Sequence, residues 1–98
     1  MTSAQWAASI EPQGTLTIDM CPAHMAQALQ DGDAALAGLV LAGTALTVAQ
    51  GTARLELLSL FSIYEAAALA GPGTVLALAA RTQLVTRGLN YYTVTGAP

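Results

Sequence analysis

The chain has 98 residues, of which 54% are hydrophobic and only 9% charged, with a net charge of −3 and a pI near 4.6. This length and composition argue against disorder and predict one domain over residues 1–98 with a single core. The only cations are three arginines, so no basic patch indicates nucleic-acid binding. The low charge instead indicates a surface that another protein or a second copy covers.

The sequence does not favour a membrane protein. Residues 1–9 lack the basic region and apolar core of a signal peptide. The run from Ala34 to Ala53 has no charge, but glycines, threonines and a glutamine dilute it. A buried strand next to a helix produces the same run and is the preferred alternative to a membrane span. The single cysteine, Cys21, fits a reducing compartment, so we predict a cytoplasmic protein with no membrane span.

The residue patterns predict strands that alternate with helices. Alternating or continuous apolar runs indicate five strands. They are Gln5–Ile10, Thr15–Met20, Leu39–Ala42, Leu46–Gln50 and Thr74–Ala80. The segment Glu11–Gly14 between the first two fits a turn. Three segments have helical patterns. The first begins near Pro22, is expected to break at Gly32 and ends at Gly38. The second runs from Thr52 to Leu69 and the third from Thr82 to Gly88. Asn90–Thr95 is an optional last strand.

The order β-β-α-β-α-β-α predicts an α/β fold. Helices between buried strands imply parallel crossovers, and the first two strands add an antiparallel edge. We therefore expect a mixed sheet of four to five strands with helices mainly on one face.

The predicted junction at Thr52 organises this scheme. A hydroxyl at a helix N-cap accepts a hydrogen bond from a free backbone N–H group, and the helix dipole favours an anion there, such as a phosphate on that hydroxyl. An ordinary helix cap is the preferred role of Thr52, and a phosphorylated hydroxyl is the alternative. The helix is apolar around most of its circumference, so one side should pack on the sheet and the other should face a partner. The segment Gly71–Gly73 should end it.

Several segments in this order resemble a STAS domain, the fold of anti-sigma-factor antagonists and of accessory subunits of Mla-type phospholipid transporters. They are Gly14–Asp19, Leu39–Leu41 with Thr44, Gly51–Leu58, Thr74–Leu76 and Gly88–Leu89, and together they span roughly Thr15 to Leu89. The resemblance implies that Thr52 is the phosphorylated hydroxyl and that the partner is a histidine-kinase-like anti-sigma factor. The family's aspartate before that hydroxyl is Gly51 here, so the implied switch is degenerate.

We therefore expect a non-catalytic regulatory module that binds a protein through this helix and its N-terminal junction. The residues expected to contact the partner are Gln50, Gly51, Thr52, Ala53, Arg54, Glu56, Ser59 and Ser62. The alternatives are an accessory subunit of a phospholipid-transport ABC ATPase and a self-associating structural protein that forms a homodimer.

No residue set indicates catalysis, a metal or a cofactor. His24 and Cys21 are the only histidine and cysteine, too few for a zinc site or for a catalytic triad. Asp31 and Asp33 flank a glycine, as in an exposed turn. The segment Gly71–Gly73 precedes a strand and not a helix, unlike a phosphate loop. The remaining candidates, Tyr91 and Tyr92, fit an interface pair or aromatic packing on a sheet.

Overall fold

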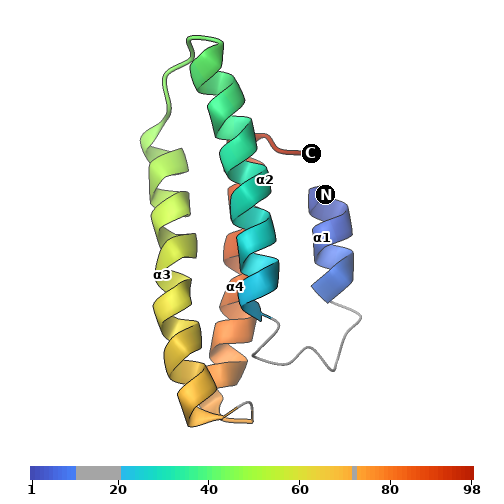
Figure 1. The fold of residues 1–98 in the computed structure, drawn as a ribbon, viewed down its shortest axis with the longest axis vertical. Helices are drawn as coiled ribbons and strands as arrows, with labels where there is room; N and C mark the ends of the chain where they lie inside the picture. Colours follow the sequence, from blue (N-terminus) through green and yellow to red (C-terminus); the bar gives the residue numbers. More distant parts are fainter. Residues whose placement is uncertain (11–20, 72) are drawn as a thin grey trace.

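The computed structural model describes residues 1–10, 21–71 and 73–98, and these residues form four helices and no strand. The helices are α1 (Ser3–Ile10), α2 (Cys21–Leu41), α3 (Val48–Ala70) and α4 (Val75–Thr95). The helices α2, α3 and α4 lie side by side, and α1 stands beside α2 on the side away from α3 (Figure 1). Helix α4 contacts each of the others, whereas α1 contacts only α2 and α4.

The predicted α/β fold is wrong. Helices contain all or most of four predicted strands, which are Gln5–Ile10 in α1, Leu39–Ala42 at the end of α2, and Thr74–Ala80 and Asn90–Thr95 at the two ends of α4. The run from Leu46 to Gln50 holds the start of α3, and the predicted helix Thr82–Gly88 is the middle of α4. The predicted turn Glu11–Gly14 and strand Thr15–Met20 lie outside the described residues. The helices therefore pack on one another, not on the mixed sheet that a STAS domain requires.

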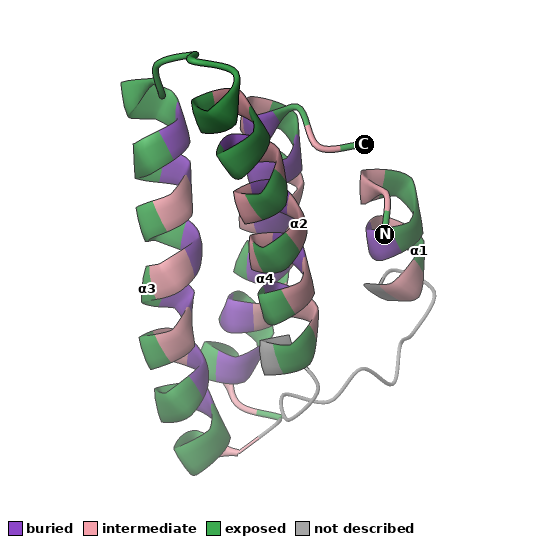
Figure 2. Cartoon of the chain, turned by 45° about the horizontal axis from the view of Figure 1, so that its top comes forward, coloured by how far each residue is buried: buried purple, intermediate pink, exposed green. Residues whose placement is uncertain are grey.

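The spacing of the buried residues explains this architecture. Buried positions recur every three or four residues, at Gln50, Ala53, Leu57, Leu60, Tyr64 and Ala67 of α3 and at Ala77, Ala80, Leu84, Gly88, Tyr91 and Thr95 of α4, where Tyr92 beside Tyr91 is also buried. This alternation produces a seam between helices. Figure 2 shows the buried positions of α3 along the side that faces the other helices. An apolar run of four to eight residues does not by itself distinguish a buried strand from part of such a helix.

The helix predicted from Thr52 begins four residues earlier. Thr47 is the N-cap: its hydroxyl accepts a hydrogen bond from the Gln50 amide at 3.2 Å, and the Gln50 side-chain oxygen accepts one from the Thr47 amide at 2.8 Å. This reciprocal pair satisfies two backbone donors at the helix start. Thr52 consequently lies in the second turn and is not the cap. The predicted end is confirmed, since Gly71 caps the helix with a φ of 107°, which favours glycine.

Two glycines inside helices allow aromatic rings to lie against the backbone. A Cβ atom at Gly32 would lie 2.2 Å from Cε2 of Tyr91, and one at Gly88 would lie 2.1 Å from Cη2 of Trp6. Both distances are far shorter than a van der Waals contact. The predicted helix break at Gly32 is wrong, because α2 continues through it and the missing side chain leaves room for the Tyr91 ring.

The substitution Gly32→Ala is expected to destabilise the chain, because the added methyl group overlaps a buried ring. Overpacking of this kind costs about 1–3 kcal/mol of unfolding free energy. Urea denaturation followed by circular dichroism measures the change. The matched control is Gly51→Ala, where no atom lies within 4 Å of the new Cβ and the helix should gain up to about 1 kcal/mol. Equal effects of the two substitutions would contradict the close contact.

Candidate functional site

The eight residues expected to contact a partner lie on different sides of α3. Gln50 and Ala53 are buried against the bundle, and Arg54 is half-buried. The other five, which are Gly51, Thr52, Glu56, Ser59 and Ser62, are exposed. Gln50 also donates a hydrogen bond from Nε2 to the carbonyl of Val94 at 3.1 Å, which ties the start of α3 to the end of α4. Gln50 and Ala53 therefore belong to the packing between helices, and the five exposed residues remain accessible to a partner.

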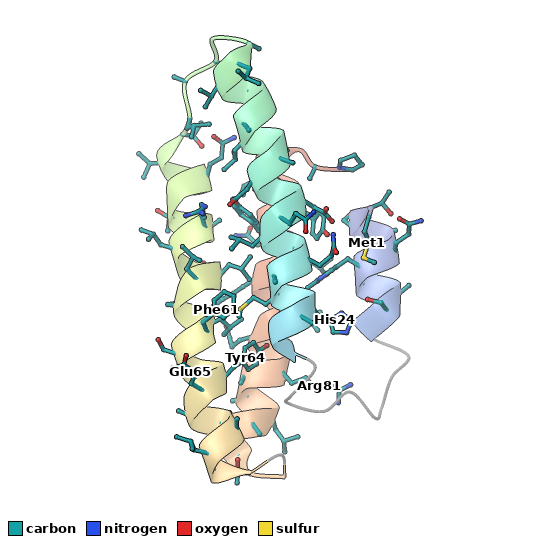
Figure 3. The ribbon with its side chains drawn as sticks, viewed as in Figure 1. Met1, His24, Phe61, Tyr64, Glu65 and Arg81 are labelled. Carbon is teal, nitrogen blue, oxygen red and sulfur yellow. The ribbon has the colours of Figure 1, made fainter. Side chains whose placement is uncertain are left out.

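An uncharged line of exposed residues follows the outside of α3, opposite its buried seam. We call it the outer stripe, and it consists of Val48, Thr52, Leu55, Ser59, Ser62, Ala66 and Leu69. Its spacing alternates between three and four residues, so the seven side chains share one face of the helix. Glu56 and Glu65 are exposed on either side of it, and Figure 3 shows Glu65 at the outer edge of α3. The outer stripe therefore has the spacing of a helix-packing seam. No described helix packs along it, although Nη1 of Arg87 on α4 donates a hydrogen bond to the hydroxyl of Ser59 at 3.4 Å.

A second exposed apolar surface adjoins the N-terminal end of the outer stripe. Residues 40–49, which are the end of α2, the connection 42–47 and the start of α3, are all exposed and carry no charge. Their large aliphatic side chains are Val40, Leu41, Leu46 and Val48. Because Val48 belongs both to this segment and to the outer stripe, the two surfaces form one continuous uncharged region.

A cluster of carboxylates and tyrosines joins the three long helices. The carboxylate of Asp33 on α2 accepts two hydrogen bonds from Arg54 on α3, from Nε at 2.9 Å and from Nη2 at 3.0 Å. It also accepts one from the hydroxyl of Tyr91 on α4. Two parallel bonds from one guanidinium fix the geometry of the pair. The prediction that Asp33 lies in an exposed turn is wrong, since it stands within α2 and binds two other helices.

The neighbouring carboxylate, Asp31, forms the second half of the cluster. It accepts hydrogen bonds from the hydroxyl of Tyr92 at 2.5 Å and from Nε2 of Gln27 at 3.0 Å. The amino group of Met1 lies 3.6 Å from the same carboxylate. Tyr91 and Tyr92 are thus buried rings of a helix whose hydroxyls reach two acids on α2, and not residues of a strand.

The charges of the cluster stabilise one another. Hydrogen bonds from Arg54 lower the pKa of Asp33, against the opposing effect of burial. Burial also raises the pKa of Asp31, but hydrogen bonds from Tyr92 and Gln27 and the positive Met1 amino group outweigh it, so the net pKa is lowered. Burial, and then the adjacent carboxylates, raise the pKa of both tyrosines. The tyrosines therefore stay protonated as donors, and the cluster acts to fix the helices.

The described residues that could bind a metal do not gather. Nδ1 of His24 lies 3.4 Å from the hydroxyl of Ser9, between α2 and α1 (Figure 3). The side chain of Cys21 lies outside the described part of the structure. Within the described ranges there is no group of three histidines, cysteines or carboxylates placed to hold an ion.

Comparison of the chain with protein families, with curated proteins and with solved structures finds no match. The resemblance to STAS domains thus rests on short sequence segments alone, and the sheet that it implies is not present in the described residues. Among the helices of the described ranges, none is sufficiently long and apolar to cross a bilayer.

Sequence reasoning missed the cluster because its partners are far apart along the chain. Tyr91 and Asp33 are separated by 58 positions and Tyr92 and Asp31 by 61. One signal was present: two acids interrupt an otherwise apolar helical pattern, and acids within a packed bundle need donors. Arg54, Tyr91 and Tyr92 are the residues that donate hydrogen bonds to these two acids.

The unfolding free energy is expected to fall in acid. The pKa values of Asp31 and Asp33 are lower in the folded chain than in the unfolded chain, where an aspartate has a pKa of about 3.9. Their ionised forms therefore stabilise the fold fully above that value, and this contribution disappears as the pH falls through the folded pKa values. Urea midpoints measured between about pH 6 and pH 2 will show the decline.

The substitution Asp33→Asn should flatten this pH dependence and lower the stability near neutral pH. The control is Glu65→Gln, which removes an exposed carboxylate away from the cluster and should leave the slope unchanged. Equal slopes for Asp33→Asn and the wild type would contradict the role of this carboxylate.

Proposed function

We propose that the chain is a non-catalytic helical module that binds another protein through the outer stripe of α3 and the adjoining α2–α3 connection. The observation that carries this proposal is the exposure of Val48, Leu55 and Leu69, at 87%, 68% and 91%, on one uncharged line. Single exposed aliphatic residues are common on any protein. Three of them at helix-packing spacing match what a partner helix or an apolar groove would contact.

The bundle does not need this surface in order to fold. Its accessible surface is 5365 Å², close to the value of about 5,200 Å² expected for a monomeric protein of this mass. The inner faces of the helices already form one core, with no unsatisfied buried side-chain polar atom among the described residues. The outer stripe therefore lies outside the core that the described helices form.

The chemistry of the stripe restricts the partner. Threonine, serine, alanine and aliphatic side chains offer shape and a few hydroxyls but no charge, so an equally uncharged partner surface loses least on desolvation. The partner classes implied by the family resemblance, a histidine-kinase-like anti-sigma factor and an ABC ATPase, remain predictions. A regulatory role, a cytoplasmic location and a homodimer also remain predictions.

The substitution Leu55→Glu should weaken partner binding at least tenfold, or about 1.4 kcal/mol, because it places a charge in the centre of the apolar contact. The fold should be retained, since the side chain is exposed and glutamate favours helices. The test compares proteins captured from the source cell by the wild type and by the variant, followed by titration of any captured protein.

The matched control is Glu56→Gln, one position along α3 and outside the outer stripe. A partner that is lost with Leu55→Glu and kept with Glu56→Gln supports the proposal. Equal capture by both variants would contradict it. Light scattering of the purified chain separates self-association from binding to another protein.

Thr52 is the position at which phosphate would act on this surface. Its hydroxyl is exposed within the outer stripe, and a phosphate there would add about two negative charges to an apolar contact. Thr52→Asp should therefore reduce capture of the partner, whereas Thr52→Ala should preserve it. If the two variants retain the partner equally, Thr52 has no part in regulation.

A further inference from the structure

The short helix α1 is held by one large side chain. Trp6 is fully buried, and it is the only buried residue among the described side chains of this helix. Ala4, Gln5 and Ala8 are exposed. A helix of eight residues is too short to be stable alone in water, so α1 depends on this anchor.

Trp6 occupies a site built by α4 and α2, which we call the tryptophan socket. Gly88 forms its floor, where the indole ring takes the place of a side chain. The ring centroids of Trp6 and Tyr92 lie 5.7 Å apart at a tilt of 48°, a favourable aromatic contact. The indole Nε1 donates a hydrogen bond to the carbonyl of His24 at 2.8 Å. The socket therefore recognises both the apolar ring and the polar edge of an indole.

Ala7 also packs against the core, and the other described contacts of this N-terminal segment are polar and less buried. The amide of Ser3 donates to the carbonyl of Pro98, and the hydroxyl of Ser9 lies near His24. The amino group of Met1 is paired with Asp31 across a partly exposed gap. Contacts of these kinds contribute little, because water competes for each group. Among the described side chains of α1, Trp6 therefore makes the largest buried contact that holds this helix to α2 and α4.

We propose that the tryptophan socket is an exchangeable docking site, and that it receives α1 of a second copy of this chain as well as its own. The occupant in both cases is the same segment, so every contact made within one chain is reproduced between two chains. The socket lies on α2 and α4, and α1 makes no contact with α3. This exchange thus uses a different surface from the outer stripe and leaves that stripe accessible.

Two complementary variants test the exchange. Trp6→Ala empties the socket, and Gly88→Ala fills the floor of the socket so that Trp6 of the same chain is displaced. A mixture of the two offers one free α1 and one free socket. Trp6 is the only tryptophan, so all indole fluorescence in the mixture comes from the Gly88→Ala chain. We expect a 1:1 complex by light scattering and a shift of the emission maximum back to that of the wild type.

Two control mixtures define the result. Gly51→Ala mixed with Trp6→Ala should show no shift, because Trp6 occupies a socket in either chain, and less complex than the test mixture, because the socket of the Gly51→Ala chain competes for its own α1. The double variant Trp6→Ala/Gly88→Ala mixed with Trp6→Ala has no indole and should stay monomeric. A complex in that second control would overturn the proposal by showing association through another surface. So would a test mixture whose spectrum is only the sum of its two components.

Hydrogen exchange on the wild-type chain gives an independent test. If α1 undocks as a unit, its backbone amides should exchange at least tenfold faster than the slowest amides of α4. Equal protection of α1 and α4 would overturn the proposal, as would a Trp6→Ala chain that does not fold, because either result makes α1 inseparable from the core.

Discussion

Aromatic rings that lie directly on glycine backbone determine how closely the helices of this chain approach one another. Tyr91 covers Gly32 between α4 and α2, and Trp6 covers Gly88 between α1 and α4. Alanines on the facing sides of α3 and α4 allow a similarly close approach along that seam. In a chain with so few charges, this fit between small residues and large rings supplies both contact area and specificity.

The polar cluster follows from the same contacts. Because the Tyr91 ring lies against α2 at Gly32, its hydroxyl reaches Asp33, which in turn binds Arg54 of α3. The charged groups of the cluster are thus used between helices, whereas on the outside of α3 the exposed Glu56 and Glu65 flank a stripe of serine, threonine, alanine and aliphatic residues. This distribution explains how a chain with low charge can have a satisfied interior and an apolar outer stripe at the same time.

The sequence allowed correct prediction of the helical body of α3, with its end at Gly71, because that pattern is long and strongly apolar. Where apolar runs were short, the sequence pattern led to helical segments being predicted as strands. Thr74–Ala80 fits a buried strand by length, yet its leucines and alanines are among the best helix formers, and propensity was the better guide. Gly32 appeared to be a helix breaker because its ring partner lies 59 positions away in the sequence. The tryptophan socket and the acid–tyrosine pairs depend on such distant contacts, which no local pattern reveals.

The most direct test of the ring-on-glycine packing is the NMR signature of the two glycines. If the rings lie on the backbone as described, the α-protons of Gly32 and Gly88 will shift upfield through ring currents and show nuclear Overhauser contacts to the rings of Tyr91 and Trp6. Random-coil shifts at both glycines, or cross-strand contacts through residues 74–80, would contradict the helical packing from which the function is inferred.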